Sequence, residues 1–213
     1  MKKEIIELAI RSPKNGVKQS DFETAKNAAV KKLVSLNGIG PERDFEPFST
    51  VPKKDGKVYV GMTKYASQGK IYRAMISFGF IVKLMKFMKM MDPLAGVFIQ
   101  PIDDSFDYEK FANKKNVTEI ALLKPKAGIS KEAFLKERAR YLKALDAEPE
   151  VVRSYTFNVT GGFKGKDTFP HFTVYKDRAA FESVTKRVGN QAFVQDFFKV
   201  FDAEIITFNT TLK

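Results

Sequence analysis

Two short turns decide the fold: Pro13-Lys14-Asn15-Gly16-Val17 near the beginning of the chain and Pro125-Lys126-Ala127-Gly128-Ile129 in its second half. They lie 125 − 13 = 112 residues apart. The same offset pairs identical residues on either side of the turns: Glu7 with Glu119, Ala9 with Ala121, Phe22 with Phe134, Leu33 with Leu145, Lys54-Asp55 with Lys166-Asp167, and Lys64 with Lys176. From Gly79, which matches Gly189, the offset is 110. Matches in so constant a register indicate a tandem duplication.

The duplication allows each element to be interpreted from two copies. Each repeat opens with a strand of alternating pattern (4–11 and 118–123), which ends at the Pro-Lys-x-Gly turn. A helix follows, and Ser20 and Ser130 are predicted to cap its two copies. The helix carries one apolar stripe, which we predict to be core: Phe22, Ala29, Val30 and Leu33 in the first copy, and Phe134, Tyr141, Leu142 and Leu145 in the second.

The remaining elements complete a known supersecondary order. Further strands are predicted at 45–50 and 153–160, at 58–64 and 169–175, and at 95–100 and 203–209. A helical pattern interrupted at Gly79 and Gly189 precedes each last strand and predicts two short helices. The order β-α-β-β-α-β is the ferredoxin-like unit. We therefore predict an α+β protein with a first repeat at 1–100, a polar linker at 101–116 and a second repeat at 117–213.

Composition and charge exclude several classes of protein. The 213 residues include 20 Phe, 7 Tyr, a single His and no Cys, which excludes a disordered chain, disulfides, thiolate metal sites and any site with two imidazoles. The net charge of +12 is spread evenly, with 19 − 13 = +6 in residues 1–110 and 18 − 12 = +6 in residues 111–213. We therefore expect no nucleic-acid partner. Lys83, Lys86 and Lys89 interrupt the most apolar segment, so we expect an amphipathic helix there, no membrane span and a cytoplasmic protein.

Two tandem ferredoxin-like repeats resemble the dimeric α/β-barrel superfamily. The resemblance implies that the two repeats close an eight-stranded barrel within one chain, as a monomer or a homodimer. One segment, Phe169-Pro170-His171-Phe172-Thr173-Val174-Tyr175, is similar to the third strand of the stress-responsive and cyclase branch. The superfamily also includes monooxygenases of the antibiotic-biosynthesis type and haem-degrading proteins.

The candidate site residues follow from the two faces of the first and third strands. One face is apolar in both copies: Leu8, Ile10, Val60 and Met62, then Phe172 and Val174. The other is mixed: Glu7 and Tyr59, then Glu119, His171, Thr173 and Tyr175. We predict that the apolar face packs under the helices and that the mixed face looks into the barrel. A carboxylate held away from water suits general acid or base catalysis.

Glu119 and His171 are the candidate catalytic residues, and Tyr155, Tyr175, Tyr59 and Glu7 are candidate ligand-binding residues. At the offset of 112, His171 matches Tyr59 and Tyr175 matches Thr63. A functional pocket is therefore expected in the second repeat only, with Glu119 or Tyr155 orienting His171. The alternative, that these residues form structural polar pairs, stays open. The sequence shows no metal-ligand cluster.

Three functions remain open at this point. The first is a cofactor-free monooxygenase or cyclase that acts on a small aromatic or polyketide-like molecule. The second is a non-catalytic barrel that binds a small hydrophobic molecule or is associated with stress. The third is a haem protein with His171 as the axial ligand. No other cofactor is expected.

Overall fold

The computed structural model describes residues 4–211. Within them, six helices and eight strands form two copies of one series. The first copy contains β1 (Ile5–Pro13), α1 (Gln19–Val34), β2 (Ile39–Val51), β3 (Tyr59–Tyr65), α2 (Gln68–Met75), α3 (Phe78–Met90) and β4 (Met91–Pro101). The second contains β5 (Val117–Pro125), α4 (Lys131–Asp146), β6 (Val151–Lys164), β7 (Phe169–Tyr175), α5 (Arg178–Val188), α6 (Ala192–Val200) and β8 (Phe201–Thr211). The duplicated order and the two short helices predicted in each repeat are confirmed.

The strands are hydrogen-bonded in the order β1-β3-β2-β8-β5-β7-β6-β4, which closes as a barrel. The predicted α+β class and the barrel formed within one chain are therefore confirmed. No helix among residues 4–211 is long and apolar enough to cross a membrane.

The chain forms two compact units. Unit 1 comprises the residues up to Glu46, Lys54–Gln100 and Val159–Lys166, and unit 2 comprises Pro47–Lys53, Pro101–Asn158 and the residues from Asp167 onward. The end of β2 thus belongs to unit 2, and the end of β6 belongs to unit 1. The repeat boundaries at residues 100 and 117 stay a prediction.

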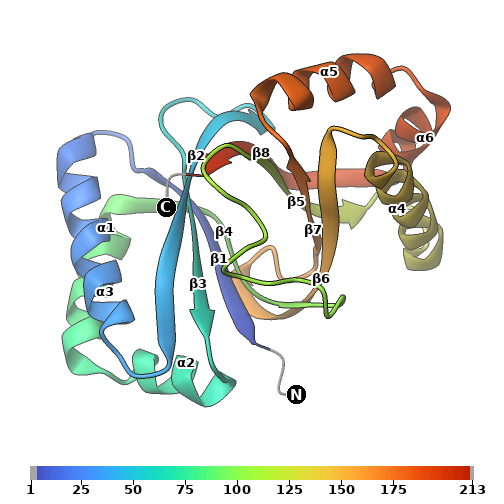
Figure 1. Cartoon of the computed structure of the whole chain (residues 1–213). Helices are drawn as coiled ribbons and strands as arrows, with labels where there is room; N and C mark the ends of the chain where they lie inside the picture. The colour runs from blue at the N-terminus through green and yellow to red at the C-terminus, as the bar shows by residue number, and fades with distance from the viewer. Residues whose placement is uncertain (1–3, 212–213) are drawn as a thin grey trace. The chain divides into compact units, whose positions relative to one another are not determined.

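In unit 1, β1 pairs antiparallel with both β3 and β4. Helices α1 and α3 lie side by side on one face of this sheet (Figure 1). Phe22 of α1 is fully buried and its ring lies 5.1 Å from that of Phe87 on α3. The apolar stripe of α1 is therefore core at Phe22, Ala29 and Leu33, as predicted.

Unit 2 repeats this arrangement with β5 between β7 and β8. Helices α4 and α6 contact each other on one face of the sheet (Figure 1). The stripe of α4, formed by Phe134, Tyr141, Leu142 and Leu145, is buried there as predicted. The Ser130 hydroxyl accepts a hydrogen bond from the Ala133 amide and so caps α4, as predicted. The prediction for Ser20 was wrong, because α1 begins at Gln19 and Lys18 is its N-cap residue.

The strand register shows that the offset between the two repeats changes from 112 to 110 earlier in the chain than the predicted point at Gly79. Glu7 pairs with Thr63 in unit 1, and Glu119 pairs with Thr173 in unit 2. The third strands therefore match at an offset of 173 − 63 = 110, and the two-residue difference lies in the connection before them. The predicted matches of His171 with Tyr59 and of Tyr175 with Thr63 were wrong. The counterpart of His171 is Gly61, and the counterpart of Tyr175 is Tyr65.

The two faces of the sheet are also reversed relative to the prediction. Glu119 and Tyr175 lie on the side covered by the helices, together with Tyr141 of α4 and Val184 of α5. The ring of Phe172 packs on the opposite side, 4.3 Å from Phe157. The alternation of the strands was predicted correctly, but the mixed face lies under the helices.

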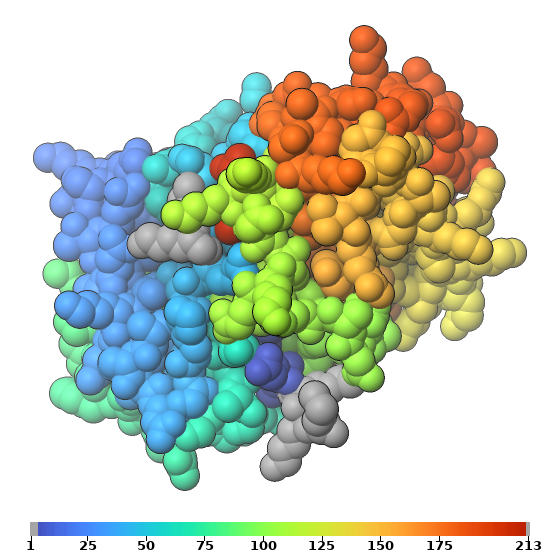
Figure 2. Space-filling view, viewed as in Figure 1, coloured from blue at the N-terminus to red at the C-terminus, as the bar shows by residue number. Residues whose placement is uncertain are grey.

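Residues 101–116 belong to unit 2 and pack against its strand β6. The Ile102 amide donates to the carbonyl of Thr156, and Arg153 forms an ion pair with Asp103 at 2.8 Å. Tyr108 and Phe111 are buried, and the ring of Phe111 lies 6.2 Å from that of Phe172. In Figure 2 the yellow-green atoms of this segment lie next to the yellow-orange atoms of β6. The segment therefore covers the face of the unit 2 sheet that the helices leave open.

Candidate functional site

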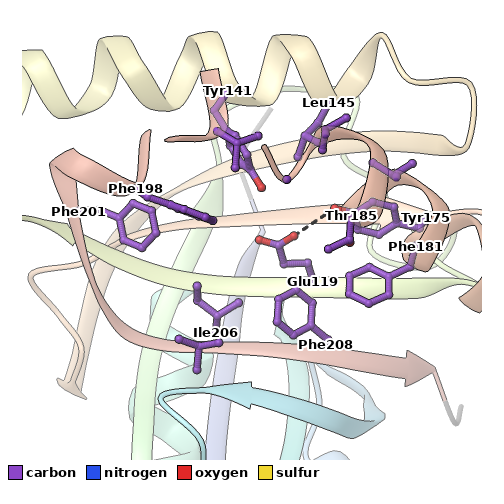
Figure 3. A pocket seen from close by; sticks show the side chains of 15 residues that line it. Glu119, Tyr141, Leu145, Tyr175, Phe181, Thr185, Phe198, Phe201, Ile206 and Phe208 are labelled. Atoms are coloured by element: carbon purple, nitrogen blue, oxygen red, sulfur yellow. Dashed lines mark hydrogen bonds between the residues drawn. The ribbon is translucent and has the colours of Figure 1, made fainter. Parts of the chain in front are cut away.

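Unit 2 contains a cavity of about 440 Å³ between its sheet and helices α4, α5 and α6. Its wall is mostly aliphatic and aromatic, and it carries one carboxylate, that of Glu119. Figure 3 shows Phe198 and Phe201 toward one end of the cavity and Phe181 and Phe208 toward the other, with Glu119 between them. The lining residues are Val51, Glu119, Tyr141, Leu145, Tyr175, Phe181, Val184, Thr185, Val188, Gly189, Val194, Phe198, Phe201, Ile206 and Phe208.

Glu119 projects from β5, the central strand of the unit 2 sheet, and its side chain is 8% exposed. Its Oε2 accepts a hydrogen bond from the Tyr175 hydroxyl at 3.2 Å. The Tyr141 hydroxyl points down from α4 toward the same carboxylate (Figure 3). A buried carboxylate between two phenols is a polar centre in an otherwise apolar cavity.

Both phenols remain protonated at neutral pH. Burial raises the pKa of Tyr141 well above its usual value, and the nearby Glu119 carboxylate adds to this. Burial likewise raises the pKa of Tyr175, followed by the negative charge of Glu119. A neutral phenol donates a hydrogen bond, so the site offers one proton acceptor and two proton donors.

These two tyrosines should make the fold sensitive to alkaline pH. The unfolded chain loses tyrosine protons near pH 10, whereas Tyr141 and Tyr175 keep theirs in the folded state. The folded state then binds more protons, so the free energy of unfolding should fall above about pH 10, by up to about 1.4 kcal/mol per pH unit for each group. Urea denaturation at pH 9, 10 and 11 measures this. Tyr175→Phe should reduce the decline, and Tyr72→Phe, at a 62% exposed position, should not; equal declines in both variants would contradict the assignment.

His171 lies behind Glu119 rather than in the cavity wall. Its Nε2 is 3.6 Å from Oε1 of Glu119, and its side chain is 1% exposed. Among the described residues, neither ring nitrogen has a hydrogen-bond partner. The imidazole instead lies near aromatic rings, 6.3 Å from that of Tyr141 and 6.4 Å from that of Phe197. The structure thus brings together Glu119, Tyr175 and His171, but only the first two line the cavity.

The equivalent position in unit 1 is filled. The Tyr65 hydroxyl donates to Oε2 of Glu7 at 2.6 Å, so the pair of a carboxylate and a phenol is present in both units. In place of His171, however, unit 1 has Gly61, and the side chains of Arg11 and Glu42 occupy the space above it. Arg11 Nη2 and Glu42 Oε1 form an ion pair at 2.7 Å. Only about 40 Å³ remains there, which favours unit 2 as the functional half.

The other candidate residues lie elsewhere. Tyr155 pairs with Phe172 on the opposite face of the sheet, and its ring packs edge-on against Phe106, so it does not orient His171. The Tyr59 hydroxyl donates to Glu23 at 2.5 Å in unit 1, and this bond lowers the pKa of Glu23 to about 2.

Sequence reasoning missed the role of Tyr141, which it assigned to the core only. One signal was available. The matching position in the first repeat is Ala29, so a small residue in one helix is replaced by a large one with a polar tip in the other.

Haem does not fit the residues of this cavity. The imidazole of His171 is buried and does not line it. Burial raises the pKa of Tyr141 and of Tyr175, so neither phenol supplies an anionic oxygen ligand at neutral pH. The described lining residues also include no Lys or Arg to pair with propionates. Among residues 4–211 no group of three or more His, Asp or Glu side chains is placed to hold a metal ion.

Comparison with known proteins identifies the fold. No family model matches the chain, and no curated protein matches it. Among solved structures, an anthrone oxidase-like protein matches 99% of this chain and 92% of its own length, with a TM-score of 0.67 and 10% identity. A proposed chlorite dismutase matches 100% and 96%, with a TM-score of 0.63 and 10% identity. A proposed monooxygenase from Fusobacterium nucleatum matches 99% and 93%, with a TM-score of 0.60 and 12% identity.

These likenesses extend over nearly the whole length of the chains. The protein is therefore a tandem ferredoxin-like α/β barrel, and it shares this fold with the matched structures. At 10–12% identity the likeness is one of fold.

Proposed function

We propose that unit 2 binds a small, flat, mostly apolar ketone with an acidic C–H bond and oxygenates it with dioxygen, without a cofactor. The observation that carries this proposal is the Glu119 carboxylate, placed between two neutral phenols in an apolar cavity of about 440 Å³. Cavities of about 300–1,000 Å³ with a few convergent polar groups are typical of small-molecule sites.

The residues supply the groups that such a reaction needs. Glu119 removes a proton from the methylene carbon that is conjugated with the ring carbonyl through the aromatic rings, and the C–H electron pair moves through these rings to the carbonyl oxygen to form an enolate. The Tyr141 hydroxyl donates a hydrogen bond to the enolate oxygen, where negative charge develops. Tyr175 holds Oε2 of Glu119 by a hydrogen bond, and Oε1 lies 3.6 Å from Nε2 of the buried His171. An apolar wall excludes water and strengthens these interactions.

Dioxygen completes the reaction. The enolate carbon gives up its electron pair to dioxygen, a C–O bond forms, and the peroxide anion takes the proton back from Glu119. The resulting hydroperoxide loses water and leaves a second carbonyl, so that R₂CH₂ and O₂ become R₂C=O and H₂O. Tyr141 and Tyr175, whose pKa values are raised by burial, can donate to the peroxide oxygens during this step.

Two of the matched proteins support this choice of substrate through their names alone. One is called anthrone oxidase-like and another is a proposed monooxygenase. Anthrone is a tricyclic ketone with an acidic methylene group, and aromatic rings suit the Phe side chains at both ends of the cavity. It is therefore the probe to use first.

Titration with anthrone under nitrogen tests binding, and oxygen uptake tests turnover. We expect saturable changes in the anthrone absorbance, and consumption of one dioxygen per anthrone in air. Thr185 is an exposed residue that lines the cavity, so Thr185→Trp should narrow the entrance and weaken binding at least tenfold. Lys186→Trp, at the next exposed position but outside the lining, is the matched control.

The outcomes distinguish the three functions. Binding of anthrone without oxygen uptake would indicate a non-catalytic binding protein and not an oxygenase. A Soret band in the purified protein would show that haem binds despite the residues described above. Equal binding by the Thr185→Trp and Lys186→Trp variants would show that anthrone does not bind in the unit 2 cavity.

A further inference from the structure

The helical hairpin α2–α3 of unit 1 exposes an unusual number of large apolar side chains. Six residues form what we call the hairpin patch: Met75, Ile76, Phe78, Val82, Met85 and Met88. Each is at least 50% exposed, and Ile76 and Phe78, at the junction of the two helices, reach 78% and 81%. Exposed large apolar side chains gathered on two consecutive helices indicate an interaction site in a folded protein.

The patch is distinct from the face of α3 that belongs to the core. Phe80 and Phe87 are buried against unit 1, at positions i and i+7. Val82, Met85 and Met88 follow at i+2, i+5 and i+8 and form a second apolar stripe toward solvent. Packing within the unit therefore does not explain the exposed stripe.

The segment of the chain that carries the patch is cationic. No Asp or Glu occurs between Asp55 and Asp92, and this stretch contains Lys57, Lys64, Lys70, Arg73, Lys83, Lys86 and Lys89. On α3, Lys83, Lys86 and Lys89 are all exposed and alternate with the apolar stripe. None of these three lysines forms an ion pair with a described carboxylate.

The second repeat shows that the fold does not require this surface. At the structural offset of 110, Met75 and Ile76 correspond to Thr185 and Lys186, and Met85 and Lys86 correspond to Gln195 and Asp196. The equivalent helices of unit 2 thus carry ordinary polar and acidic residues at these sites. At two further positions unit 2 resembles unit 1, since the 49% exposed Phe198 corresponds to Met88 and Lys199 corresponds to Lys89.

We propose that the hairpin patch docks on the surface of an anionic lipid bilayer. Helices with exposed Phe and Met on one stripe and Lys beside it lie in the interface, with apolar side chains inserted and the cations near lipid phosphates. The absence of acidic residues over the whole stretch fits a surface of negative charge. A second copy of the chain fits poorly, because a symmetric contact would bring the same lysines together.

Vesicle binding and fluorescence test the proposal directly. The chain has no Trp, so Phe78→Trp places a single reporter at the tip of the hairpin. With vesicles of phosphatidylcholine and phosphatidylglycerol we expect a blue shift of its emission and co-sedimentation of the protein. Neither effect should appear with phosphatidylcholine alone, and 0.5 M NaCl should weaken both.

Two variants separate the contributions of apolar area and charge. Lys83→Gln/Lys86→Gln/Lys89→Gln should weaken binding about a hundredfold, because each cation near such a surface contributes about fivefold. Ile76→Lys introduces the residue that unit 2 has at the corresponding position, Lys186. Although this variant adds a positive charge, it should weaken vesicle binding, because it removes an apolar side chain that would insert into the bilayer. Val152→Ser, at a 51% exposed apolar position in unit 2, is the control and should bind as the parent does.

The proposal would be overturned by no binding to anionic vesicles, by equal binding to neutral vesicles, or by a dimer that Ile76→Lys converts to a monomer. Binding to soluble polyglutamate without binding to vesicles would also overturn it and would indicate an acidic protein partner instead. Circular dichroism of each variant shows whether it is folded.

Discussion

Glu119→Gln is expected to lower the rate of anthrone oxidation by a factor of about 10²–10⁴, the usual contribution of a general base. Gln has nearly the same shape as Glu, and its amide oxygen can still accept the hydrogen bond from Tyr175. Anthrone binding should therefore change much less than turnover. Oxygen uptake at saturating anthrone measures the effect on kcat, and titration under nitrogen measures the effect on binding.

The duplication supplies the matched control for this variant. Glu7 accepts the equivalent hydrogen bond from Tyr65, but the space beside it in unit 1 is only about 40 Å³. Glu7→Gln should therefore leave the turnover unchanged. If both variants lost activity equally, or if Glu119→Gln oxidised anthrone at the parent rate, Glu119 would not be the base.

Phe134→Ala is expected to destabilise the fold by about 3–5 kcal/mol, the usual cost of truncating a buried Phe. Phe134 is fully buried on α4, and its ring lies 5.3 Å from Phe169 of β7 and 6.1 Å from Phe197 of α6. Removing the ring would leave a void between a helix, the sheet and a second helix, which rigid backbones cannot close.

Urea denaturation of Phe134→Ala measures this cost. Lys136→Ala, at an exposed position on the same helix, is the control and should change the free energy of unfolding by less than about 0.5 kcal/mol. A loss below about 1 kcal/mol for Phe134→Ala would show that the helix is not anchored through this ring.

Much of the fold could be predicted because the sequence contains two copies of the same series of elements. The Pro-Lys-x-Gly turns and the helical stripes sit at identical places in both repeats, since both are constrained by backbone geometry and burial. The point where the offset changes could not be found this way. Lys54-Asp55 and Lys166-Asp167 are identical at the offset of 112, but they lie in the connection before the third strand, where length can vary. Only the strand register shows that the third strands match at 110.

The sequence also could not show which of the two sheet faces packs against the helices. Alternation tells which residues share a face, and it correctly grouped Glu119 with Tyr175. It does not tell which face the helices cover when both faces are buried. Here Phe111 and Phe157 cover one face of β7, and α4 and α6 cover the other, so hydrophobicity is similar on both.

Strand alternation also explains why only part of the candidate site was predicted. Glu119 and Tyr175 share a strand face and could be grouped by parity. Tyr155 was predicted to be part of the same site, but the strand register puts it on the other face, opposite Phe172. Tyr141 reaches the carboxylate from a helix, and no sequence pattern reports the distance between a helix and a strand.

The Arg11–Glu42 ion pair of unit 1 has no counterpart in unit 2. Unit 2 carries Leu123 and Ser154 at the two corresponding positions, which are 112 residues further along the chain. Removing both partners of a buried ion pair together costs less stability than removing one of them, because no unpaired buried charge is left. The Arg11–Glu42 pair is therefore one of several differences between the closed copy and the open one, beside Gly61 in place of His171 and Ala29 in place of Tyr141. A duplicated chain of this kind can specialise one half for chemistry while the other half keeps the same fold with its cavity closed.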